Sequence, residues 1–246
     1  RPTAARHASS GVPSRGVNEP GPVSVRTAPT TATWRLRSWP GDPTVGHLVL
    51  VDHQRLPEPA TVAAGLDTAR RRGYRGVRTS ALFPAAAQVL ASMGFVTADR
   101  LALLRRDGLA GLDALDGAAV RLRRLRPWQF GAAADVDRVA FGRERGNDAA
   151  ALRDITGATP LHRARAAGRP LDGFAISGAS GTTGYLQRIA VHPGVQRTGI
   201  ATALVTDALA WMAARGLTAA LVNTGTDNLA ALALYERFGF VRLGDD

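Results

Sequence analysis

The residues best suited to chemistry lie in one short segment, Gln196-Arg197-Thr198-Gly199-Ile200-Ala201. It stands between an apolar run that ends at Val191 and a helical pattern over residues 201–215. The first amides of a helix have no acceptor inside the helix, and the helix dipole adds partial positive charge there. Small residues let an anion approach this backbone closely. The segment therefore predicts a phosphate or pyrophosphate site, although such a glycine is also typical of tight packing alone.

A second group of polar residues follows in "GTDNLAALALYERFGF", where a helix is predicted to start at Asp227-Asn228 and to stop at Gly239. Taken alone, Tyr235 on this helix indicates a structural residue with a buried ring and a solvated hydroxyl. Asn228 is a good helix N-cap, a role that can coexist with ligand binding.

Together the two segments resemble the motifs of the Gcn5-related N-acetyltransferase (GNAT) family. Gln196, Gly199 and Ala201 match its Gln/Arg-x-x-Gly-x-Gly/Ala pattern, and Val191-His192-Pro193 matches the Val-x-Pro before it. The family's second motif, Asn-x-x-Ala-x-x-x-Tyr-x-x-x-Gly-Phe, is matched by Asn228, Ala231, Tyr235, Gly239 and Phe240. The detailed resemblance covers residues 183–242.

The resemblance implies that acetyl-CoA is the co-substrate and that an acetyl group passes to a primary amine by direct attack. The amine would belong to a small molecule or to a protein N-terminus. No metal is expected, because the five His residues are scattered and show no ligand spacing. The implied coenzyme-binding residues are Ile189, Ala190 and Val191 for the pantetheine arm, Gln196, Arg197, Thr198, Gly199, Ile200 and Ala201 for the pyrophosphate, and Asn228. Tyr235 would be the catalytic residue that protonates the departing thiolate.

The general base is where the sequence departs from the family. Some relatives carry a Glu late in the strand after the glycine-turn helix, and Asn223 stands at that position. The strand before the glycine turn has no acid either, and His192 lies in a turn beside proline. A water chain to Asp172 or His162 stays open. The missing base leaves an alternative function, an acetyl-CoA-binding module with weak or no catalysis.

The first half of the chain contains a worn copy of the same order of elements. Helix, Gly73 and strand in "ATVAAGLDTARRRGYRGVRTS" correspond to helix, Gly216 and strand in the second half. The following helices end at Gly94-Phe95 and Gly239-Phe240. The first copy lacks the glycine turn. The repeat predicts two units rather than a solenoid.

We therefore expect a mixed α+β fold of two GNAT-like units, each a mostly antiparallel sheet flanked by helices, with a splayed coenzyme-binding strand pair in the second. The expected boundaries are 1–33 for a disordered tail, 34–112 for a degenerate unit without a coenzyme loop, and 113–246 for the acetyltransferase domain. The family adds a strand after its Gly-Phe. The first unit has one, "RLALLRR", but the second ends at "VRLGDD", so a truncation, another segment or another subunit must account for that edge.

Composition narrows the function classes further. The chain has no cysteine, which excludes disulfides, thiolate metal sites and a cysteine nucleophile, and no apolar run approaches the length of a membrane span. We expect a cytoplasmic protein without a membrane partner, and a homodimer stays open. The net charge is +11, but it is spread along the chain, and the one dense run, "RLRRLR", falls on a predicted edge strand. This distribution disfavours nucleic acid as a partner.

Overall fold

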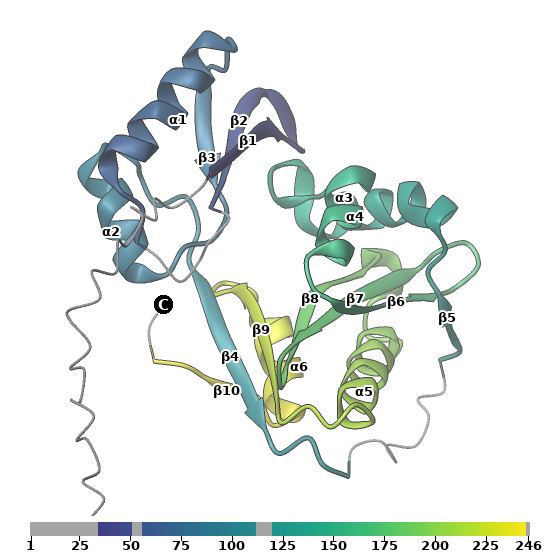
Figure 1. The fold of residues 1–246 in the computed structure, drawn as a ribbon. Coiled ribbons are helices and arrows are strands. Elements are labelled where there is room, and N and C mark those ends of the chain that lie inside the picture. The colour runs from purple at the N-terminus through teal and green to yellow at the C-terminus, as the bar shows by residue number, and fades with distance from the viewer. Residues whose placement is uncertain (1–33, 51–55, 112–119, 245–246) are drawn as a thin grey trace, which may run out of the picture. The chain divides into compact units, whose positions relative to one another are not determined.

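The structure is a computed structural model that describes residues 34–50, 56–111 and 120–244. The expected tail, residues 1–33, and the expected boundary between residues 112 and 113 lie outside the described residues. The described strands form two sheets (Figure 1). One has three strands in the order β1-β2-β3, and the other has seven in the order β10-β4-β9-β8-β7-β6-β5. The predicted mixed fold with two sheets flanked by helices is confirmed.

The three-stranded sheet comes entirely from the first half of the chain. Its strands are β1 (Trp34–Trp39), β2 (Asp42–Leu50) and β3 (Gly76–Thr79), and its helices are α1 (Pro59–Arg71) and α2 (Pro84–Ser92). β1 and β2 pair antiparallel, whereas β2 and β3 pair parallel. The side chains of Leu48, Val62 and Leu90 are buried together between sheet and helices.

The two halves share the predicted order of elements. In the second half α5 (Ile200–Ala213) is followed by Gly216, β9 (Ala219–Gly225), α6 (Leu229–Arg237) and Gly239. Both these glycines and their counterparts in the first half have φ between 69° and 89°, the left-handed conformation that ends a helix with glycine. Phe83 is the N-cap of α2 where Asn228 is the N-cap of α6, so the first copy has an apolar residue at the polar position.

The seven-stranded sheet carries helices on both faces. Its remaining strands are β5 (Leu122–Arg124), β6 (Leu161–Ala167), β7 (Gly173–Ser180), β8 (Thr183–Val191) and β10 (Val241–Arg242). The short 3-10 turns η2 (Pro127–Gln129) and η3 (Pro193–Val195) precede α3 (Phe130–Arg145) and α5, and α4 (Ala149–Gly157) follows α3. Figure 1 shows α5 on one face of β6–β8 and α3 with α4 on the other.

One strand of this sheet comes from the first half of the chain. β4 (Leu101–Asp107), the "RLALLRR" strand, pairs antiparallel with β9 along its whole length and with β10 on its other edge. Ala102 and Leu104 of β4 are fully buried in the cluster that also holds Tyr235 and Phe240. The second half does have a strand after Gly239-Phe240, the short β10, contrary to the expectation from its sequence. The strand β4 from the first half lies between β10 and β9.

Candidate functional site

The strand pair β8–β9 opens at the middle of the seven-stranded sheet. These are the two parallel neighbours, and their pairing runs from Thr183 opposite Ala219 to Leu186 opposite Val222. Beyond that point β8 continues along β7 alone, and β9 continues along β4. The edge of β8 that faces β9 is therefore without a strand partner from residue 187 to residue 191 in the described part of the chain.

A β-bulge lies where the two strands part. Ile176 on β7 faces Arg188, but the next residue, Ser177, faces Leu186, so Gln187 is the extra residue on β8. A bulge bends its strand and increases the local twist. The bend supplies a physical reason why β8 leaves β9 at this residue rather than continuing the parallel pair.

The turn after β8 leads directly into α5 and presents free amides. Arg197 has φ 63° and Gly199, the N-cap of α5, has φ 88°, so the backbone curls twice through the left-handed region. The amides of Val195 and Gln196 bond within the turn, whereas residues 197–199 donate no backbone hydrogen bond among the described residues. A Cβ placed on Gly199 would meet only Val120, at 3.9 Å. The turn is thus an open, donor-rich concavity that fits a pyrophosphate.

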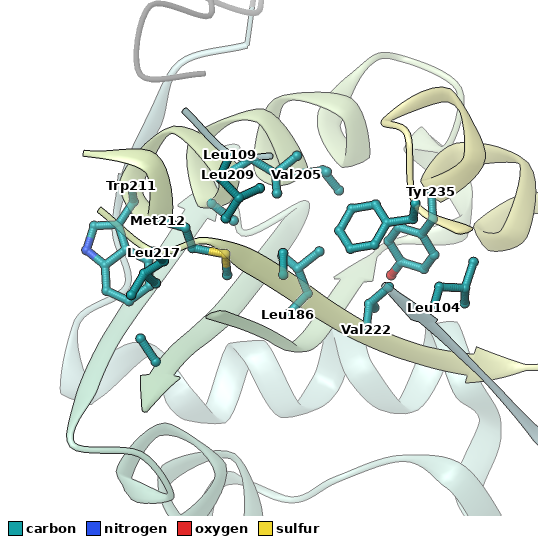
Figure 2. Packing of buried hydrophobic residues seen from close by; sticks show 14 of the residues in the cluster. Leu104, Leu109, Leu186, Val205, Leu209, Trp211, Met212, Leu217, Val222 and Tyr235 are labelled. Atoms are coloured by element: carbon teal, nitrogen blue, oxygen red, sulfur yellow. The ribbon is translucent and has the colours of Figure 1, made fainter. Parts of the chain in front are cut away.

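Tyr235 lies at the point where β8 and β9 part. Figure 2 shows the Tyr235 ring beside Val222, in the cluster that also holds Leu186. Leu186 and Val222 are the last paired residues of β8 and β9. The Tyr235 side chain is buried and contacts the Phe240 ring edge-on, with centroids 5.7 Å apart. Burial raises the pKa of the Tyr235 phenol to about 12, against a smaller lowering by the Arg188 charge. The phenol therefore keeps its proton at neutral pH and can donate it.

Asn228 is the N-cap of α6, as predicted. Its Oδ1 accepts a hydrogen bond from the amide of Ala231 at 3.2 Å, which caps α6. Its Nδ2 donates no hydrogen bond among the described residues, so this group stays available to a ligand.

The predicted site residues meet in one cavity of about 1780 Å³. Tyr235, Asn228, residues 189–191 and the glycine turn line it, with the exception of Thr198, whose hydroxyl donates to the Val195 carbonyl at 2.7 Å. Because the cavity joins the turn to the point where the strands part, a ligand can reach from one to the other.

The residues considered as a general base do not reach this cavity. His192, Asp172 and His162 are absent from its lining, and His192 accepts a hydrogen bond from the Gly194 amide through Nδ1 at 3.1 Å. Asn223 does line the cavity but cannot take a proton. Three carboxylates line the cavity walls elsewhere: Asp99, Glu144 and Asp227. Among the described residues, no three His, Asp or Glu side chains are grouped as metal ligands.

A buried ion pair beside the cavity was not predicted. Asp137 on α3 is fully buried and receives two hydrogen bonds from the Arg188 guanidinium, at 2.6 and 2.7 Å. Arg188 also stacks on Phe141, 3.7 Å from the ring centroid, and donates to the Arg145 carbonyl. Asp137 in addition accepts the Asn147 amide at 2.6 Å. The pair thus ties β8, directly after its bulge, to the end of α3.

The sequence held a signal for this pair. Of the two acids in "FGAAADVDRVAF", Asp137 falls at helical spacing from the apolar residues Phe130, Ala133 and Ala134, and Arg188 interrupts the apolar pattern of β8. A buried acid at such a position needs a partner charge. Other cavity residues had no comparable signal, because Arg37, His47 and Arg78 come from the first half of the chain and belong to no recognisable motif.

Comparisons with known proteins agree with this geometry. Residues 140–240 match the model of the acetyltransferase (GNAT) family. The mycothiol acetyltransferase of Streptomyces scabiei is 41% identical over 63 residues, 26% of this chain and 20% of that protein. The mycothiol acetyltransferase of Streptomyces avermitilis is 29% identical over an alignment of 251 residues, 91% of this chain and 82% of that protein.

Two solved structures share the fold over most of the chain. A tandem GNAT protein from the clavulanic acid biosynthesis pathway gives a TM-score of 0.58 at 15% identity, covering 86% of this chain and 76% of that one. A GCN5-related N-acetyltransferase from Sphaerobacter thermophilus gives 0.54 at 14% identity, covering 85% and 73%. At these identities the likeness concerns the fold alone.

Proposed function

We propose that this chain, whose residues 140–240 match the acetyltransferase (GNAT) family, moves the acetyl group of acetyl-CoA to a primary amine by direct attack. The observation that carries the proposal is the parting of β8 and β9 after Leu186 and Val222, with a free strand edge leading to the open turn before α5. A long, thin donor with a phosphate end fits that path.

In this proposal each part of the coenzyme meets a matching part of the chain. The amides of the turn over residues 196–201 bind the pyrophosphate, with the positive end of α5 behind them. The free edge of Ile189–Val191 pairs with the amides of the pantetheine arm as a further strand would. The free Nδ2 of Asn228 donates to the coenzyme from the opposite side. The thioester then lies near Tyr235, where the strands part.

The chemical step needs a nucleophile, an oxyanion site and a proton donor. The amine nitrogen attacks the thioester carbon, and the C–N bond forms as the carbonyl oxygen takes up negative charge. A backbone amide of Ile189–Val191 stabilises that oxyanion. The C–S bond then breaks, and Tyr235 gives its proton to the sulfur. The nitrogen releases its own proton to water, from which the phenol is reprotonated.

No cavity-lining carboxylate lies on β8 or β9 among the described residues. We therefore expect the amine to enter already neutral. The log of kcat/KM should rise with pH towards the pKa of the amine itself. A plateau above pH 7, set by an enzyme group, would contradict this mechanism and would assign a base to Asp99, Glu144 or Asp227.

The donor site is tested first by calorimetry with acetyl-CoA. Gly199→Glu places a bulky anion in the turn, and we expect it to weaken binding at least about 100-fold through repulsion of the pyrophosphate. Gly199→Ala is the matched control, since it carries the same φ penalty but only a Cβ in open space. If both variants bind acetyl-CoA equally, or if the folded wild type does not bind it, the proposed enzyme activity is contradicted.

The proton donor is tested with Tyr235→Phe, which keeps the ring contact with Phe240. We expect kcat to fall by about 100-fold, with an unchanged Kd for acetyl-CoA. Binding without thioester consumption in the wild type, across a panel of amines, would instead favour the alternative of a catalytically inactive coenzyme-binding module.

The full-length relative suggests a second candidate acceptor. Streptomyces avermitilis mycothiol acetyltransferase aligns with 91% of this chain. The amine acceptor of that enzyme therefore belongs in the same acceptor panel.

A further inference from the structure

The three-stranded sheet contributes a polar wall to the cavity, which we call the Arg37–Arg78 wall and define as Arg37, Trp39, His47, Arg78 and Ser80. Arg37 Nε approaches His47 Nδ1 at 3.4 Å, and His47 Nε2 lies 2.9 Å from Ser80 Oγ. The Trp39 and His47 rings meet edge-on with centroids 4.8 Å apart. The Arg78 guanidinium lies 5.3 Å from the Trp39 ring centroid. These residues form one connected group.

The directions of these hydrogen bonds make the wall a set of donors. Burial, with the nearby Arg37 charge, lowers the pKa of His47 to about 4, so the ring is neutral at pH 7. Because Arg37 donates to Nδ1, the ring proton is on Nε2 and is donated to Ser80 Oγ. The Ser80 hydroxyl proton is then free to point elsewhere. This order also excludes His47 as a base that would activate Ser80 as a nucleophile.

The cations of the wall are held more firmly than their acidic partners. Arg37 pairs with Asp154, and their side chains are 40% and 63% exposed. Arg78 pairs with Glu144 at 3.4 Å, and their side chains are 35% and 81% exposed. An incoming oxyanion can therefore displace either carboxylate into water while the guanidinium groups keep their contacts with His47 and Trp39. An incoming cation would instead have to displace the Arg37 or Arg78 guanidinium group, which His47 or Trp39 holds in place.

We propose that the Arg37–Arg78 wall binds an oxyanion of the acceptor, and hence that the acceptor is an amine that also carries a carboxylate or a phosphate group. Guanidinium forks suit both groups, because each offers two oxygens in the matching geometry. The inference rests on the proposed function, since it takes this cavity to hold both co-substrates.

The first test compares matched amines in an assay of coenzyme A release. The pairs are β-alanine against β-alaninamide, and 2-aminoethyl phosphate against ethanolamine. We expect kcat/KM to be at least tenfold higher for the anionic member of one pair, and that pair identifies the anion. Arg78→Gln and Arg37→Gln should abolish the preference by raising the KM for the anionic amine, with kcat and the KM for acetyl-CoA unchanged. Arg138→Gln, an exposed arginine outside this cavity, is the control for loss of one charge.

A binding measurement decides the matter even if every amine turns over slowly. The wild-type complex with coenzyme A is titrated calorimetrically with N-acetyl-β-alanine and with N-acetyl-2-aminoethyl phosphate. Binding of one of them that Arg78→Gln weakens at least tenfold supports the proposal. Binding of neither, or equal binding by the variant, overturns it while the donor site stands. Failure to bind coenzyme A at all would overturn the proposed function itself.

Discussion

At the scale of single residues, the site divides into residues that carry a motif and residues that only the fold assembles. The glycine turn follows from spacing, because amide donors at a helix start are a local feature. The roles proposed for Asn228 and Tyr235 are implied by the resemblance to the GNAT motifs. The Arg37–Arg78 wall follows from neither, since its members belong to no motif in the sequence. Their neighbours decide their role, and those neighbours come from three strands.

The Asp137–Arg188 pair gives a prediction at this scale. Replacing Asp137 by Asn leaves the Arg188 guanidinium without its carboxylate in a largely buried place, which should cost about 3–5 kcal/mol of unfolding free energy. The double variant Asp137→Leu with Arg188→Met should cost less than Asp137→Asn alone, because neither charge is then left buried. Urea unfolding of the three proteins measures both costs. A double variant less stable than the single one would mean that the pair itself is net stabilising.

At the scale of elements, much of the fold is local information. Helices and strands of the second half follow from apolar periodicity and from the glycines that stop α5 and α6. The partners of β4 are different, because a strand carries no local mark of which sheet it joins. The sequence placed a strand in the first copy, but only the fold shows that this strand pairs with β9 and β10.

The contribution of β4 is tested with two leucines of equal burial. Leu104 on β4 and Leu48 on β2 are both 1% exposed, so Leu→Ala at either should cost about 2–5 kcal/mol. Leu104 packs in the cluster that holds Tyr235, whereas Leu48 packs in the three-stranded unit. We expect only Leu104→Ala to weaken acetyl-CoA binding as well. Calorimetry at a temperature where both variants are folded measures their acetyl-CoA binding. If both variants lose binding equally, β4 has no specific role in the site.

At the scale of the whole molecule, charge and pH link stability to the first half of the chain. The formal charge of +11 comes without any lysine, and the described residues include no helix long and apolar enough to span a membrane. His47 is a group whose protonation should affect stability between pH 6.5 and 4. Its pKa is lowered to about 4 in the fold by burial, against an unfolded value near 6.5.

Below pH 6.5 His47 becomes protonated in the unfolded chain but stays neutral in the folded chain. Stability should therefore be full above pH 6.5 and should decline as the pH falls towards 4, by about 2 kcal/mol once partial solvent access of the ring is allowed for. Thermal melts from pH 7 to 4.5 measure the decline. His47→Gln has no such titration, so its curve should be flatter, and an equally steep curve would place the acid sensitivity in other groups.

The position of β4 in the seven-stranded sheet also sets an order of events during synthesis. β4 leaves the ribosome early, but its partners β9 and β10 lie more than a hundred residues further along the chain. Until they arrive, β4 is a strand with two unpaired edges, and pairing over such a separation is slow. The seven-stranded sheet is thus complete only once β10 has been made. A chain whose synthesis stalls before that point exposes an aggregation-prone strand edge and does not form a partly active enzyme.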